Sequence, residues 1–499
     1  MYPHPTVILP SRSEASGPPR PLVAHMDRFD ATVFVVLIST VLAMTAYTLA
    51  RGQQLLALLL AVLATVCVTA ITHPRAYRLA AMAGLLAIPF VSATPAFRPL
   101  EYDYLIYLAA FSLMLVGLGV FQEAPIPATL GSAYLGYVLL AGSIVAISAQ
   151  GIQDGIRVLP TLMVSFGMYV LIIRSDKLER RLFLGGLFVL GAVQSVVAIL
   201  QVFTGWPVFS TVLPTLFKEG RNYFAYVIPG MGTTVTLGSG TFYHFNLLGS
   251  VLAMLTPIAF ALWLERSRSA LRIALFGLLA AGTVCTFSRG SLLAVTLGIA
   301  ILLFGEYRRG RRQASIVIIS ALGVIALLIV NVASRYVEAS GNIAIRQSTW
   351  WYAINDALEQ PSNLLIGYGF LHFQRAVLSP GDSGEGVRSF VLPFLHSGSL
   401  QLLLEFGVVG VVLFALWVAT AVRRSRSCSE SYLVRGLVAA TAAFVCYQFV
   451  ENILFAYPGI LFAVVLGLLE AESLQTPLES DSDLTRRDSW LSATRHGAR

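Results

Sequence analysis

Residues 245–263, FNLLGSVLAMLTPIAFALW, decide the fold because they are almost continuously apolar. A hydrocarbon core of about 30 Å is crossed by roughly 20 residues of helix, so this stretch predicts a membrane-spanning segment. Strands of a membrane barrel would alternate apolar and polar residues, whereas this stretch and the similar runs elsewhere in the chain do not. The runs therefore predict helices.

The composition of the whole chain agrees with a membrane protein. Of its 499 residues, 56% are hydrophobic and only 12% are charged, whereas soluble domains carry roughly 25% charged residues. We predict an all-α, polytopic bundle of about fourteen transmembrane helices over residues 31–473, between polar, disordered tails at residues 1–30 and 474–499. The apolar runs centre near Ile38, Leu60, Leu86, Ser112, Val138, Val164, Leu190, Met254, Leu278, Val295, Ile325, Val411, Ala442 and Ala463.

The loops between the runs predict the orientation. Every second loop is basic, and the short loops between them hold a single basic residue, such as Arg51, Arg98 or Arg157. The positive-inside rule places the basic loops, and with them both termini, in the cytoplasm. The net charge of +8 is then explained by orientation, and we expect no nucleic-acid partner. The basic positions are Arg75 and Arg78; Arg174, Lys177, Arg180 and Arg181; Arg266, Arg268 and Arg272; Arg308, Arg309, Arg311 and Arg312; and Arg423, Arg424, Arg426 and Arg435.

Two long connections fall on the opposite, outer side of the predicted membrane. They cover about residues 204–240 and 334–395, and loops of this length are uncommon unless they are functional. Residues 343–359 of the second loop have helical apolar spacing. Trp350, Trp351 and Tyr352 lie in that segment, and such side chains favour a membrane interface.

Two residues at predicted outer helix ends are candidates for chemistry. Arg289 lies between two closely spaced apolar runs, where a guanidinium can grip phosphate with paired donors or, alternatively, anchor the helix end. His396 opens the span after the second long loop, where an imidazole can act as a general base or simply hydrogen-bond the helix start. Arg346 and Arg221 can add positive charge to an outer site or be surface charges. Glu405 lies nine residues beyond His396, and the sequence does not reveal its partner.

Several short segments between residues 228 and 414 form an ordered set. They are Gly240-Thr241-Phe242-Tyr243-His244-Phe245-Asn246; Ser288-Arg289-Gly290; Arg346 to Trp350; Leu365-Ile366-Gly367-Tyr368-Gly369-Phe370 with Phe373; and His396, Leu400-Gln401-Leu402, Glu405-Phe406-Gly407 and Gly410. In this order and spacing, they resemble the O-antigen ligase and O-antigen/exopolysaccharide polymerase family, and the family-like region covers residues 228–414.

The resemblance implies a multi-spanning glycosyltransferase of the cell inner membrane that acts on its periplasmic face. It implies a donor glycan on undecaprenyl diphosphate, an acceptor that is a glycan or a lipid core, His396 as the catalytic base, and Arg289, Arg346 and Arg221 as diphosphate ligands. Arg221 lies some twenty residues before the Gly-Thr-Phe segment, farther than in many members. Ser397 stands where members often carry asparagine, which leaves a role for that asparagine unfilled.

The same reading implies no metal and no cofactor, because the sequence shows no Asp/Glu cluster and no phosphate-cradling glycine-rich loop. We expect inversion at the anomeric carbon and contacts with membrane lipids and other polysaccharide assembly proteins. Ligase and polymerase activity stay open, because they differ only in the acceptor. A transporter or flippase for lipid-linked glycans is the alternative; it would place charged residues near the midplane, often with internal repeats. A scaffold without chemistry would not need the arginine and histidine at these helix ends.

Overall fold

The computed structural model describes residues 82, 85–86, 129–147, 152–204, 225–227, 234–242, 244–266, 269–310, 323, 342–359, 361–369, 396–428, 430–451 and 457–475. All of them belong to the second of the two units into which the chain divides, Ala70–Arg499. Both predicted tails lie outside these residues. So, wholly or largely, do the predicted spans near Ile38, Leu60, Leu86, Ser112 and Ile325.

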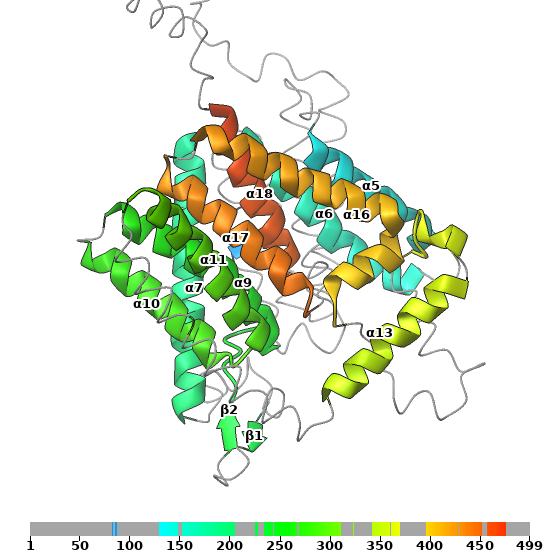
Figure 1. The fold of residues 1–499 in the computed structure, drawn as a ribbon, viewed down its shortest axis with the longest axis horizontal. Coiled ribbons are helices and arrows are strands. Elements are labelled where there is room, and N and C mark those ends of the chain that lie inside the picture. The colour runs from blue at the N-terminus through cyan, green and yellow to red at the C-terminus, as the bar shows by residue number, and fades with distance from the viewer. Residues whose placement is uncertain are drawn as a thin grey trace, which may run out of the picture. The chain divides into compact units, whose positions relative to one another are not determined.

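The described part is helical apart from one small hairpin (Figure 1). Strands β1 (Ala225–Val227) and β2 (Thr234–Thr236) pair antiparallel, with Tyr226 opposite Val235. This hairpin lies in the first long loop, so the described part is not entirely α-helical as predicted. The helices are α5 (Leu130–Ile147), α6 (Ile152–Arg174), α7 (Lys177–Thr204), α9 (Phe245–Glu265), α10 (Ala270–Cys285), α11 (Arg289–Arg308), α13 (Asn342–Glu359), η3 (Pro361–Leu364), α16 (Gly398–Arg424), η4 (Ser425–Cys428), α17 (Tyr432–Gln448) and α18 (Tyr457–Gln475).

Within the described ranges, nine of the predicted apolar runs coincide with helices, namely α5, α6, α7, α9, α10, α11, α16, α17 and α18. Five of the nine, α7, α9, α11, α16 and α18, are long and apolar enough to cross a membrane. The protein is therefore a helical membrane protein, and the total of about fourteen spans stays a prediction.

The helices pack in two groups that meet at α17 and α18. Helix α9 packs against α7, α10, α11 and α17 in the first group, and α6 packs against α5 and α18 in the second, where α16 also lies against α5 (Figure 1). Small residues allow close approach in the first group: a Cβ on Gly436 of α17 would lie 3.0 Å from the Cβ of Ala261 on α9. Close backbone contact of this kind replaces the hydrophobic driving force that helices lack in lipid.

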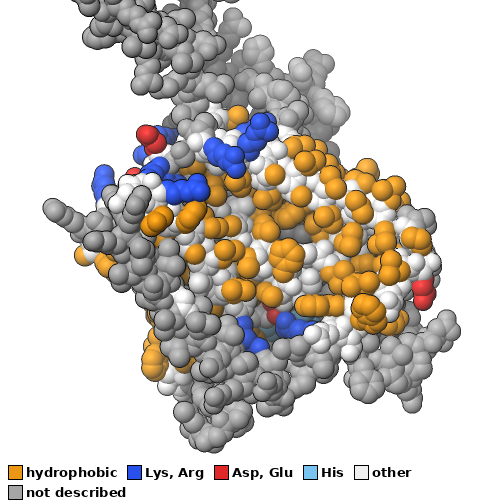
Figure 2. Space-filling model, viewed as in Figure 1, with side chains coloured by type: hydrophobic (Ala, Val, Ile, Leu, Met, Phe, Trp, Pro, Cys, Tyr) orange, Lys and Arg blue, Asp and Glu red, His pale blue; other side chains and the backbone are white. Residues whose placement is uncertain are grey.

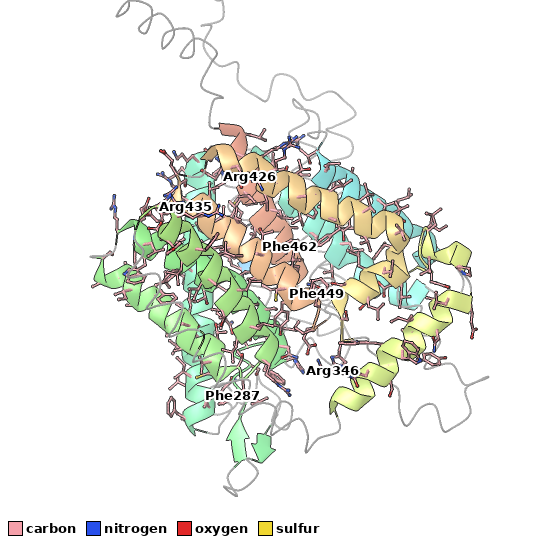
Figure 3. All side chains as sticks on the ribbon, viewed as in Figure 1. Phe287, Arg346, Arg426, Arg435, Phe449 and Phe462 are labelled. Atoms are coloured by element: carbon pink, nitrogen blue, oxygen red, sulfur yellow. The ribbon has the colours of Figure 1, made fainter. Side chains whose placement is uncertain are left out.

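Charged side chains gather at the two ends of this bundle. Figure 2 shows Lys and Arg side chains gathered at one end, an apolar belt beside them, and a second, smaller basic group beyond the belt. Arg426 and Arg435 mark the first end and Arg346 and Phe287 the opposite end (Figure 3). The two groups are therefore separated by the apolar length of the helices.

The helix predicted at residues 343–359 is confirmed as α13, Asn342–Glu359. Its inner side buries Ala353 and Ala357 together with Leu404 of α16, while Trp351 and Leu358 are exposed on the other side. The spacing of these residues follows the helical period of 3.6, which is why the sequence pattern identified the helix.

Helix α16 is interrupted at Gly407, whose backbone (φ 67°, ψ −172°) is outside the helical region. The segment after α13 fills the interruption. Tyr368 N donates to Leu404 O over 2.7 Å, and Gly369 N donates to Glu405 O over 3.1 Å. In return, Val409 N donates to Leu365 O over 3.1 Å. Two family-like motifs, Leu365–Gly369 and Glu405–Gly407, are thus the two halves of one backbone contact.

Candidate active site

The end of α17 is the point on which the candidate residues converge. The carboxylate of Glu451, three residues beyond α17, accepts hydrogen bonds from Asn246 Nδ2 at 2.8 Å and from Arg346 Nη2 at 3.0 Å through its Oε1. Its Oε2 lies 3.2 Å from His396 Nδ1. One carboxylate thereby joins the start of α9, helix α13 of the second long loop and the start of α16.

His396 is held by the local fold at the start of α16. Its backbone is left-handed, with φ 47°, a conformation that costs a non-glycine residue free energy and is often retained at functional sites. Ser397 caps the helix, and its Oγ accepts from Leu400 N. Gly398 N donates to the backbone oxygen of Glu451 over 3.2 Å. A Cβ on Gly398 would collide with the side-chain amide of Gln448 and lie 3.3 Å from the backbone oxygen of Glu451, so a larger residue would require the Gln448 side chain to move.

Arg346 binds the end of α17 with two nitrogens. Nη1 donates to the carbonyl oxygen of Val450 over 3.1 Å, and Nη2 donates to the carboxylate of Glu451. The Arg346 side chain is 30% exposed and that of Glu451 is 13% exposed. This ion pair is thus partly shielded from solvent while its arginine still reaches the surface.

The electrostatic environment favours the charged form of Glu451. Burial raises the pKa of Glu451, but the hydrogen bond with His396 and the charges of Arg346 and His396 lower it more, so the pKa lies below the ordinary 4.5. At His244, at the start of α9, the environment instead favours the neutral form. Burial and the electrostatic effects of His396 and Arg346 lower the pKa of His244 below 6.5, although Glu451 acts in the other direction. The site thus keeps a carboxylate charged and one imidazole neutral.

His244 has a structural role that requires an unprotonated Nδ1. Its Nδ1 accepts a hydrogen bond from Asn246 N over 3.1 Å and so caps α9. Asn246 in turn directs its side chain to Glu451. The cap and the amide together fix the position of the α9 start against the end of α17.

Arg289 is the first residue of α11, and its neighbours bind the same end of α17. Ser288 Oγ lies 3.0 Å from Tyr447 OH, and Tyr447 OH donates to Asn246 O over 3.1 Å. A Cβ on Gly290 would lie 2.7 Å from Val450 Cγ2. The backbone of Arg289 is therefore packed beside Val450, the residue whose carbonyl accepts from Arg346, and its side chain is exposed.

The segment before α9 is held by two glutamines of α7. Gln194 exchanges two hydrogen bonds with Thr241, one to its hydroxyl at 2.6 Å and one from its backbone N at 2.8 Å. Gln201 accepts from the backbone of Ser239 and Gly240 and donates to Gly240 O. Gly240 has φ 60°, which favours glycine. This family-like segment therefore builds the turn that leads into His244 and Asn246.

The structure thus brings together three of the four residues that the sequence singled out. His396 and Arg346 share the carboxylate of Glu451, Arg289 lies on the adjoining turn, and Arg221 is outside the described residues. Glu405 is not part of this group; its Oε1 accepts from Gln401 Nε2 over 2.6 Å on the preceding turn of α16. In the described ranges, no group of three or more His, Cys, Asp or Glu side chains is arranged to hold a metal ion.

A comparison with known families gives this site a context. Residues 274–415 match the family model of the O-antigen ligase. This segment of the chain is therefore similar to the O-antigen ligase family. The resemblance inferred from the sequence motifs is thereby confirmed. No curated protein matches the chain.

The matched segment contains Arg289, Arg346 and His396 but not the residues that connect them. Asn246 precedes the matched segment, and Glu451 follows it. Sequence reasoning missed Glu451 because its partners lie far away along the chain. The signal that could have identified it is an acidic residue between two apolar runs, at a predicted outer helix end where a charge needs a partner.

Proposed function

We propose that the protein is a glycosyltransferase that takes its donor glycan from a lipid diphosphate, specifically undecaprenyl diphosphate, at the outer face of the cell inner membrane. The observation that carries the proposal is the convergence of His396 and Arg346 on Glu451, beside Arg289. The match to the O-antigen ligase supports a ligase or polymerase type of transfer.

The side of the membrane is inferred from charge. Arg426 and Arg435 lie at the end of the bundle opposite Arg346 (Figure 3), and the positive-inside rule assigns the more basic end to the cytoplasm. The site then faces the periplasm. That compartment lacks nucleotide sugars, so a donor there must arrive already activated, as a lipid diphosphate does.

His396 is the proposed general base. Its Nδ1 faces the charged Glu451, which favours the tautomer with the proton on Nδ1 and makes Nε2 the basic nitrogen. In the reaction, the acceptor hydroxyl gives its proton to Nε2 while its oxygen attacks the anomeric carbon. The bond from that carbon to the diphosphate oxygen breaks, and the diphosphate leaves with the electron pair. Attack opposite the leaving group inverts the anomeric centre.

Arg289 and Arg346 are the proposed diphosphate ligands, with Arg221 as a third candidate. Negative charge grows on the departing diphosphate, so guanidinium groups aimed at it stabilise the transition state more than the ground state. The start of α11 at Arg289 adds the positive end of a helix dipole. These fixed positive charges can do the work that a metal ion does in other transferases, which is why we propose a metal-independent reaction.

Reconstitution tests the proposal. The purified protein in liposomes, supplied with an undecaprenyl-diphosphate glycan and a glycan or lipid-core acceptor, is expected to release undecaprenyl diphosphate and form a glycosidic bond. NMR of the product is expected to show inversion. Gene deletion followed by glycan gels separates the two activities: single repeats on the normal acceptor indicate a lost polymerase, and long chains left on the lipid carrier indicate a lost ligase.

A transporter of lipid-linked glycans is the second candidate, and the interruption of α16 favours it, because broken helices line many transport sites. However, the carbonyl groups exposed at Gly407 are occupied by Tyr368 and Gly369, which supports a role in holding the outer loop. Movement of a labelled lipid-linked glycan across liposomes, without any new glycosidic bond, would favour transport.

A further inference from the structure

The ion pair between Arg346 and Glu451 joins the outer-loop helix α13 to the end of α17. Arg346 contributes one of its two outer nitrogens to Glu451 at 3.0 Å and the other to Val450 O at 3.1 Å. A guanidinium has five N–H donors in a planar fork, and this one is partly exposed. The arginine can therefore approach an anion from solvent without leaving the site.

Glu451 does not depend on Arg346 alone. Asn246 Nδ2 at 2.8 Å and His396 Nδ1 at 3.2 Å also bind its carboxylate. A buried carboxylate that loses its only partner carries a large penalty, but here two donors from α9 and α16 would stay. Loss of the Arg346 contact therefore leaves the Glu451 carboxylate with two donors.

A diphosphate competes well for that contact. It carries more than one negative charge and offers paired oxygens, which match the fork of the guanidinium better than a shared carboxylate does. Glu451 is therefore a competitor of any diphosphate for Arg346, as well as a partner of His396.

We propose that Glu451 and the donor diphosphate exchange Arg346: the carboxylate holds the arginine in the empty site, and the diphosphate takes it over on binding. This inference rests on the proposed function. It assigns Glu451 two opposing effects. Glu451 weakens donor binding, because it competes for Arg346. Glu451 also supports transfer, because it positions His396.

Inorganic pyrophosphate binding to the full chain in nanodiscs tests the exchange. Glu451→Gln removes the charge but keeps the shape, and we expect it to bind pyrophosphate about two- to fivefold more tightly, the range for a partly exposed ion pair. In an Arg346→Gln background the same change is expected to have no effect on affinity. Glu306→Gln is the matched control, because Glu306 pairs with Arg435 Nη1 at 2.8 Å at the other end of the bundle.

Unchanged or weaker pyrophosphate binding in Glu451→Gln would overturn the exchange, as would equal tightening in the Arg346→Gln background. Glu451→Asp serves if the first variant does not fold; its shorter side chain is expected to reach Arg346 poorly and to tighten binding to a smaller extent. The outcome of the pyrophosphate test does not depend on whether the chain transfers glycan. Failure of the wild-type chain to transfer glycan would remove the function whatever the pyrophosphate affinities are.

Discussion

The interruption of α16 makes a quantitative prediction at Gly407. Its φ of 67° and ψ of −172° lie in a region that is essentially limited to glycine, and other residues there lose about 1–3 kcal/mol. A Cβ would also press on the carbonyl of Leu365. Gly407→Ala is therefore expected to let α16 continue as a regular helix and to release residues 365–369.

The size of the effect follows from the contacts that would be lost. Three backbone hydrogen bonds hold the two segments together, donated by Tyr368, Gly369 and Val409. With the glycine conformation and roughly 1 kcal/mol for each bond, local stability is expected to fall by about 4–6 kcal/mol. Hydrogen–deuterium exchange at Tyr368 and Gly369 is then expected to be at least about a thousandfold faster.

A second glycine provides the control for this experiment. Gly277 lies in α10, and a Cβ there would meet no atom within 4 Å, so Gly277→Ala is expected to leave exchange and glycan transfer unchanged. Gly407→Ala is expected to reduce transfer, because α13 carries Arg346. Wild-type exchange rates at Tyr368 and Gly369 in Gly407→Ala would refute the backbone contact as the element that holds the outer loop.

Three further predictions concern the charged residues of the site. Arg289→Lys keeps the charge but loses the paired donors, and we expect about a hundredfold slower transfer; wild-type rates would return Arg289 to the role of a helix anchor. The pKa of Glu451 is held below 4.5, so the stability that its carboxylate contributes is expected to persist above pH 4.5 and to disappear as the pH falls through the lowered pKa. Its loss should appear as faster hydrogen–deuterium exchange in α13. Exchange in α13 that does not change with acid would contradict the ion pair. The imidazole of His244 is expected to titrate below 6.5, and NMR should show a further decrease in Glu451→Gln, which removes the one charge that raises this pKa; an increase would contradict the assignment.

Apolar runs and, at residues 343–359, amphipathic spacing predicted helices that the described residues contain. The runs near Met254 and Val411 became α9 and α16, and the amphipathic spacing at residues 343–359 became α13. These helices could be predicted locally, because neighbouring residues determine whether successive turns are buried or exposed to lipid. Alternation of basic loops also predicted that Arg289 and His396 share one end, and both lie against the last turn of α17 and the residues that follow it.

The features that the sequence did not reveal depend on contacts between distant segments. The interruption at Gly407 lies within an apolar run that is compatible with an unbroken helix, and only the loop around Tyr368 gives it partners. In the sequence, Glu451 is a single charge at a helix end. Only the fold brings Asn246, Arg346 and His396 to its carboxylate. The hairpin at Ala225–Val227 is three residues per strand, too short for a period of two to be recognised.

Single-turnover transfer by His396→Ala tests the central claim most directly. The variant in liposomes, with the undecaprenyl-diphosphate donor and acceptor bound, is expected to transfer glycan about 10²- to 10⁴-fold more slowly than wild type, the contribution of a general base. Insertion and thermal stability should be retained, because Ser397 still caps α16. Ser399→Ala, on the first turn of the same helix, is the control and should transfer at the wild-type rate. Transfer by His396→Ala at the wild-type rate would contradict the assignment of the base and, with it, the proposed active site.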